Sequence, residues 1–85
     1  MKTIYHIKPA DVLDFLASRK ESIVSIGYAA KDDTFLIKVE EGYYDSVLQT
    51  LADMRKAYKP NTEEFDSLNE AISAIKTLID MGVLK

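Results

Sequence analysis

Hydrophobic and polar residues alternate with a period of two from Ser22 to Glu40. One face of the first run carries Val24, Ile26 and Tyr28, and the pattern resumes after the polar break KDDT with Phe35, Ile37 and Val39. Such alternation is typical of strands with one buried face. We therefore expect a β-hairpin that turns at KDDT and ends at Gly42.

Beyond Gly42 the spacing of apolar residues becomes helical. Two series recur at intervals of three and four: Tyr44, Val47, Leu51, Met54 and Tyr58, then Phe65, Leu68, Ile72, Ile75 and Ile79. Pro60 interrupts the first helix, and Asn61 with Glu64 resembles a capping box for the second. Folded back on each other, the two series match layer by layer, from Tyr58 with Phe65 to Tyr44 with Ile79. This agreement predicts an antiparallel αα-hairpin.

The N-terminal segment predicts a strand and a short helix. Ile4, Tyr5 and Ile7 form a β-prone run, and Pro9 suits the first turn of a helix that ends near Arg19 and Lys20. The expected order is thus β-α-β-β-α-α, an α+β fold in which a small antiparallel sheet packs with the helical hairpin. We expect one domain over residues 1–85, with residues 1–42 forming the strand, helix and β-hairpin, and residues 43–84 the αα-hairpin.

Additional apolar residues widen the helical stripes beyond the seam. They are Leu48, Ala71, Ala74 and Leu78. This surface could lie against the sheet or against a second copy of the chain, so a homodimer is an open alternative.

Composition narrows the classes of protein to consider. The 85 residues are 47% hydrophobic and 29% charged, with no cysteine. The lack of cysteine fits a reducing compartment, and no apolar run reaches the length of a signal peptide or a membrane span. We expect a cytoplasmic protein without a membrane segment.

Charge argues against a nucleic-acid surface. The net charge is −3, and residues 41–85 carry five basic and eight acidic residues. A chain that neutralises many phosphates needs a basic stripe, which the sequence lacks. A modest basic spot at Arg19 and Lys20 remains.

The inventory of catalytic and ligand-binding groups is thin. His6 is the single histidine, and neither a nucleophilic triad nor a tetrahedral zinc site can be assembled without further histidines or cysteines. The acidic pairs suit a turn, a strand exit and a helix start, and the three glycines lie too far apart for a phosphate loop. We expect neither enzymatic activity nor a cofactor or metal.

These observations favour a non-enzymatic module that binds another protein as a regulator, adaptor or inhibitor. Its small size alone is consistent with a phage or prophage origin. The candidate contact residues are Tyr43, Tyr28 and Tyr5, because tyrosine offers a large contact area at low entropic cost. Each could equally be a half-buried structural residue, and we assign the neighbouring Tyr44 to the core.

A second hypothesis links the chain to nucleic acid. It would contact nucleic acid weakly through its sheet face and basic side chains, or act on a nucleic-acid enzyme. The basic candidates are Arg19, Lys20, Lys31 and Lys38. The charge balance disfavours the direct form.

Overall fold

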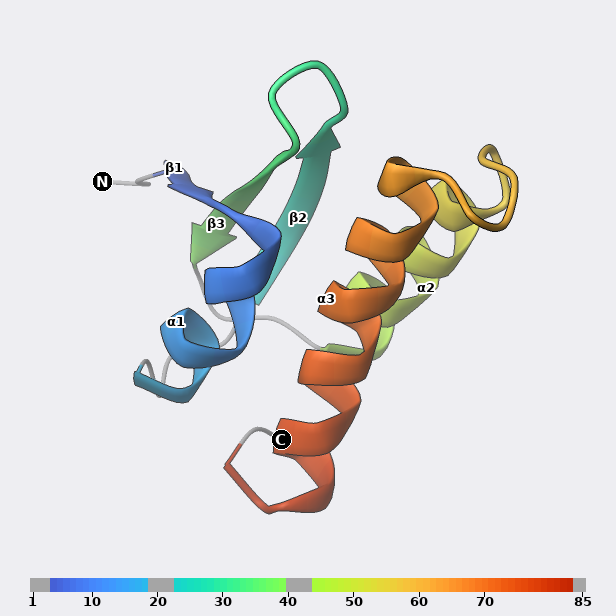
Figure 1. Ribbon diagram of the computed structural model, residues 1–85. Coiled ribbons are helices and arrows are strands. Elements are labelled where there is room, and N and C mark those ends of the chain that lie inside the picture. Colours follow the sequence, from blue (N-terminus) through green and yellow to red (C-terminus); the bar gives the residue numbers. More distant parts are fainter. Residues whose placement is uncertain (1–3, 19–22, 40–43, 84–85) are drawn as a thin grey trace.

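The computed structural model describes residues 4–18, 23–39 and 44–83 (Figure 1). Along the chain the elements are strand β1 (Ile4–Ile7), the 3-10 turn η1 (Pro9–Asp11), helix α1 (Val12–Ser18), strands β2 (Ile23–Ala29) and β3 (Thr34–Val39), and helices α2 (Tyr44–Arg55) and α3 (Glu63–Asp80). This order confirms the predicted α+β fold.

The three strands form an antiparallel sheet in the order β1-β3-β2. Ile37 of β3 pairs with Ile26 on one side and with Tyr5 on the other, while Phe35 pairs with Tyr28 and with Ile7. Because directly paired residues point to the same face of a sheet, all six side chains share one face. The alternation predicted for the hairpin is therefore confirmed for its described side chains.

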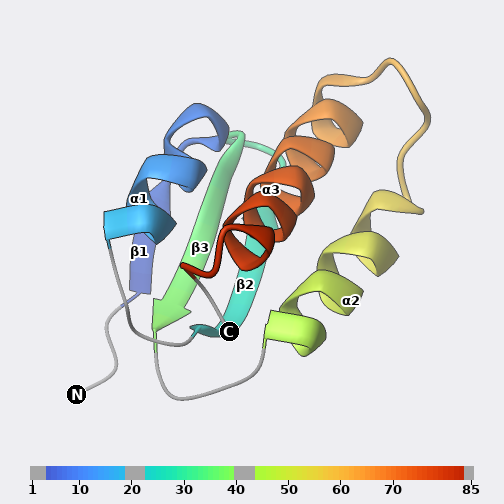
Figure 2. The same cartoon turned by 90° about the horizontal axis from the view of Figure 1, so that it is seen from below.

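Helices cover this face of the sheet. Figure 2 shows α3 lying between α1 and α2, and α3 contacts both. The opposite face is not covered by any described helix, since even Leu36, on the central strand, is only half-buried there. The protein is thus a two-layer structure with one covered and one open sheet face.

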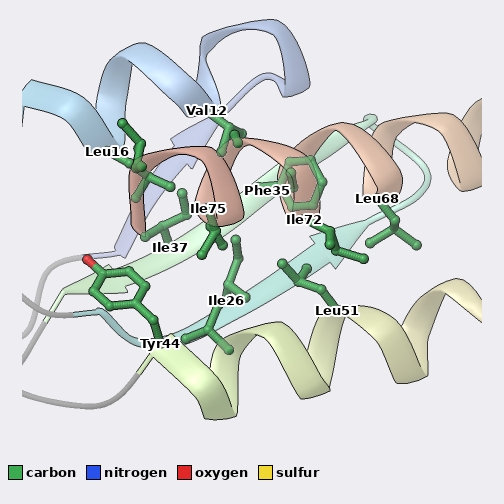
Figure 3. Packing of buried hydrophobic residues seen from close by; sticks show 14 residues of the cluster. Val12, Leu16, Ile26, Phe35, Ile37, Tyr44, Leu51, Leu68, Ile72 and Ile75 are labelled. Carbon is green, nitrogen blue, oxygen red and sulfur yellow. The ribbon is translucent and has the colours of Figure 1, made fainter. Parts of the chain in front are cut away.

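All layers contribute to a single apolar core (Figure 3). Phe35 and Ile37 at its centre have no exposed surface. One side of α3 faces it, and α1 contributes Val12 and Leu16. The buried side chains of α3 are Ser67, Leu68, Ala71, Ile72, Ala74, Ile75 and Leu78. The wider stripe predicted for α3 therefore covers the sheet as well as α2.

The predicted αα-hairpin is present, and contacts of Arg55 show the relative orientation of its two helices. Arg55, at the end of α2, donates a hydrogen bond of 2.5 Å from Nη1 to Asn69 Oδ1. Its guanidinium carbon lies 5.7 Å from the centre of the Phe65 ring. Because Phe65 and Asn69 belong to the first turns of α3, the two helices run antiparallel.

The connection between these helices differs from the prediction in two details. Helix α2 ends at Arg55, and Tyr58 follows in the turn while still packing against the core. The N-cap of α3 is Thr62, whose side chain accepts a hydrogen bond from the Phe65 amide, so the predicted cap at Asn61 is wrong. Asn61 has a φ of 72°, a left-handed conformation that asparagine tolerates better than most residues.

Candidate functional site

A partly buried polar cluster joins the β-hairpin turn to α3. The hydroxyl of Tyr28 donates to Asp33 Oδ1 over 2.5 Å, and the hydroxyl of Ser67 donates to the same oxygen over 2.7 Å. Ser67 is only 6% exposed, the one buried polar residue among the described ones. The bond from Ser67 spans 34 residues of sequence, so it holds two distant elements together.

The backbone of the turn directs Asp33 toward α3. Asp33 has a φ of 48°, and its amide donates to the carbonyl of Ala30 over 3.3 Å. Left-handed backbone is unfavourable for most residues but is several-fold enriched in aspartate and asparagine. The choice of Asp at this position therefore satisfies both the turn and the contact with the helix.

The same hydrogen bonds shift two pKa values in opposite directions. The hydrogen bond from Tyr28 lowers the pKa of Asp33, aided by Ser67 and by the charge of Lys8, while burial opposes this shift. Burial, together with the hydrogen bond to Asp33, raises the pKa of Tyr28 to about 12. At neutral pH the cluster therefore consists of a carboxylate held by two neutral hydroxyl donors.

A cavity of about 630 Å³ opens beside this cluster, between the start of α3 and the link from β1 to η1. Asp33 and Ser67 of the polar cluster line it, and Lys8, Pro9 and Ala10 line it from the segment that links β1 to η1. The remaining lining side chains come from α3: Glu63, Asp66 and Glu70.

A second cavity of about 260 Å³ continues along α3 toward its C-terminal end. It shares Pro9, Ala10 and Glu70 with the first, so the two cavities adjoin between α3 and the η1–α1 segment. Leu13, Ser73, Ala74 and Thr77 complete its lining. We call these two adjoining cavities together the α1–α3 groove.

The side chains that line the groove offer charged, hydrogen-bonding and apolar contacts. Neither histidine nor cysteine lines it, and the Ser67 hydroxyl already donates to Asp33. A carboxylate with a lowered pKa is a poor general base, because it gives up its proton too readily. No group of three or more potential metal ligands occurs among the residues that the structure describes.

Two of the three candidate tyrosines lie on the covered face of the sheet. Tyr28 packs against Phe35, with ring centres 5.0 Å apart, and edge-on against Tyr58 at 6.4 Å. Tyr5 lies 5.2 Å from the ring of Phe15. Both are half-buried and support packing, while a contact with a partner stays a prediction. Tyr43 lies outside the described residues.

The two described basic candidates, Lys31 and Lys38, lie at opposite ends of the β-hairpin. Lys31 is exposed in the hairpin turn, whereas Lys38 is half-buried near the other end of β3, on the open sheet face. Arg19 and Lys20 lie outside the described residues. His6 is exposed on the same open face as Lys38, as its position in β1 opposite Leu36 requires.

The open face itself is small and mixed in character. Ile4 is 55% exposed there, and Ser25, Gly27 and Ala29 present little side-chain surface. Its edges are poor templates for another strand: β1 has four residues, and the β2–β3 register shifts between Ile23 and Ser25. Short strands and bulges are devices that limit edge-to-edge pairing.

The sequence did carry a signal for the groove. Five polar residues of α3 recur at intervals of three and four, parallel to the apolar series: Glu63, Asp66, Glu70, Ser73 and Thr77. A polar stripe of this kind also occurs on any solvated helix face. The stripe of α3 becomes one wall of a groove only because residues about 60 positions earlier in the chain form the opposing wall.

Comparisons with protein-family models, with curated proteins and with solved structures found no match to this chain. Among the described residues, no helix is long and apolar enough to cross a membrane. The functional argument therefore starts from the geometry of the α1–α3 groove.

Proposed function

We propose that this protein is a non-enzymatic binding module that takes up a segment of a partner protein in the α1–α3 groove. One observation carries the proposal: two adjoining cavities lie along α3 and share three of their lining residues. By holding this segment, the protein would act as a regulator, adaptor or inhibitor of the partner. We place this activity in the cytoplasm, in keeping with the cysteine-free composition.

The dimensions of the groove suit a peptide segment. Glu63 and Thr77 mark its two ends on α3, and at a rise of 1.5 Å per residue they are separated by about 21 Å along the helix axis. A helix laid into a groove is a common mode of peptide recognition. Hydrogen bonds of the Tyr28–Asp33–Ser67 cluster hold the hairpin-turn side of the groove against α3.

Direct nucleic-acid binding has less support. Single-stranded nucleic acid is usually held on a sheet by stacking on exposed aromatic rings, whereas Tyr5, Tyr28 and Phe35 all point to the covered face. The carboxylates that line the groove would repel phosphates. An action on a nucleic-acid enzyme is compatible with the proposal, since it is a form of protein binding.

Two matched substitutions test the groove. Ser73→Arg introduces a bulky cation inside it, and Ser46→Arg makes the same change on an exposed position of α2. Partners are captured from the native host with wild-type bait, identified by mass spectrometry, purified and titrated against all three proteins. We expect Ser73→Arg to weaken binding at least about tenfold and Ser46→Arg to leave it unchanged. Equal affinity of all three proteins would refute the groove as the binding site.

A further inference from the structure

The two ends of the α1–α3 groove differ in chemistry. At the end nearest the hairpin turn, Glu63, Asp66 and Glu70 occupy one face of α3 and are all exposed. Within the described part of the chain, no lysine or arginine lies within ion-pair distance of these three carboxylates. Lys8 lines the same cavity, but its ammonium donates to the carbonyl of Asp32 over 2.9 Å. This end therefore has a net negative charge, because four carboxylates, of Asp33, Glu63, Asp66 and Glu70, line it together with the single positive charge of Lys8.

The other end is apolar and has small side chains. Leu13 is 42% exposed there, one of four large apolar residues with such exposure among the described ones. Ala10, Ser73 and Ala74 surround it and leave room for a close approach of backbone or of a large side chain. An exposed leucine beside small residues is a site where a partner's apolar side chain can be buried.

We infer that the groove binds a basic amphipathic helix, with lysine or arginine side chains beside Glu63, Asp66 and Glu70 and an apolar anchor beside Leu13. The inference rests on the proposed function and specifies the partner's chemistry. Charge complementarity indicates that the partner helix has basic residues beside the three carboxylates. The exposed leucine indicates that the partner has an apolar side chain at the other end. A helix of about 14 residues would span the groove at 1.5 Å per residue.

A second copy of this chain does not supply such a helix. The charged residues of α1 and α2 are Asp14, Asp45, Asp53 and Arg55, so both helices are net negative. In α3, five acidic residues stand against the single Lys76. Two acidic surfaces repel each other, so the groove favours a different protein as its partner.

The experiment uses two synthetic, fluorescein-labelled helical peptides of about 14 residues. Both have the same apolar stripe, but one has lysine and the other glutamate at its polar positions. Binding to the full-length protein is measured by fluorescence anisotropy at low and at physiological salt. We expect the lysine peptide to bind more tightly than the glutamate peptide by at least about tenfold, with the difference shrinking as salt increases.

Variants separate the groove from the general negative charge of the protein. The double variant Asp66→Asn/Glu70→Gln should weaken the lysine peptide about tenfold. Its control, Asp45→Asn/Asp53→Asn, removes the same charge from α2 and should change affinity less than about twofold. Leu13→Ser should weaken the peptide at all salt concentrations, since it removes an apolar contact.

The outcomes distinguish this inference from the proposed function. Equal binding of the two peptides, or equal effects of the two double variants, would overturn the basic-helix inference. If Ser73→Arg blocks the native partner while the lysine peptide fails to bind, the groove stands as the binding site and the inference about its ligand falls. If Ser73→Arg leaves the native partner bound, the proposed function falls.

Discussion

At the scale of single residues, Asp33 combines two structural roles. Its backbone adopts a left-handed turn, and one carboxylate oxygen accepts two hydrogen bonds, from Tyr28 and from Ser67. Hydrogen bonds to a charged group contribute about 1.5–3 kcal/mol each when they are well shielded. Asp33 therefore fixes the hairpin turn against α3 and forms part of the groove wall.

Asp33→Asn tests this role through pH. Asparagine keeps the left-handed turn and an amide oxygen but lacks the charge. Because the folded-state pKa of Asp33 is lowered, its charge stabilises the fold above the unfolded-state pKa of about 3.9, and this contribution is lost as pH falls through the folded-state value. We expect the variant to be about 1–2 kcal/mol less stable at pH 7, with the difference disappearing toward pH 2.

Urea unfolding followed by circular dichroism between pH 7 and pH 2 measures this difference. Asp32→Asn is the control, because it removes the same charge from the neighbouring exposed residue. A difference for Asp33→Asn that stays constant over the whole pH range would show that its charge does not stabilise the fold.

Residue patterns predicted the orientation of Tyr28 but not its partners. The period of two placed it with Ile26 on the covered face, where the structure has it. The hydrogen bond from Tyr28 to Asp33 depends on the conformation of the turn. The hydrogen bond from Ser67 to the same Asp33 connects residues that lie 34 positions apart in the sequence. Local spacing contains no information about such a contact, because only the tertiary arrangement brings these elements together.

At the scale of elements, the two sides of α3 differ in what they contact. Its apolar side contacts α2 and the sheet, and its polar side lines the groove. The periodicity predicted the apolar side well, since burying a stripe at this spacing is what makes the helix stable. The cap was misplaced by one residue, because Asn61 and Thr62 are both good N-cap residues and only the backbone geometry separates them.

Thr62→Ala tests the observed start of α3. The Thr62 hydroxyl accepts a hydrogen bond of 3.2 Å from the Phe65 amide, and alanine would leave that donor without its cap. We expect a loss of about 1 kcal/mol in the free energy of unfolding. Thr50→Ala serves as the control, because this exposed threonine lies inside α2 and only bonds back to the carbonyl of Ser46; alanine there should be neutral or slightly stabilising.

Denaturant titration of the three proteins gives the comparison. A Thr62→Ala protein as stable as Thr50→Ala would mean that the Phe65 amide finds another acceptor or water. Asn61→Ala would then be the next variant to measure, since it changes a left-handed position in the same turn.

At the scale of the whole molecule, the sequence predicted which face of the β-hairpin is buried, but neither the inward face of β1 nor which strand is central. Alternation along β1 and β3 is independent of their pairing, so the order β1-β3-β2 became known only from the structure. The same limit applies to the α1–α3 groove, whose two walls come from opposite ends of the chain. The predictions thus held for the elements and for the buried face of the hairpin, and they did not address contacts between distant segments.

The central position of β3 has a consequence for the order of folding events. Strands β2 and β3 are joined by a tight turn, whereas β1 pairs with β3 across about 30 residues of intervening chain. Closing the longer loop costs more conformational entropy before any contact compensates for it. We therefore expect β2 and β3 to associate before the transition state and β1 to join after it.

Kinetic measurements on two Ile→Ala variants would reveal this sequence of events. Ile7→Ala in β1 should mainly accelerate unfolding, with a φ-value below about 0.3, whereas Ile26→Ala in β2 should also slow refolding. Equal φ-values would indicate that the sheet forms in one step. If β1 does join late, the wall of the groove that includes Lys8 and Pro9 is completed last, and a newly made chain acquires the proposed binding surface only at the end of folding.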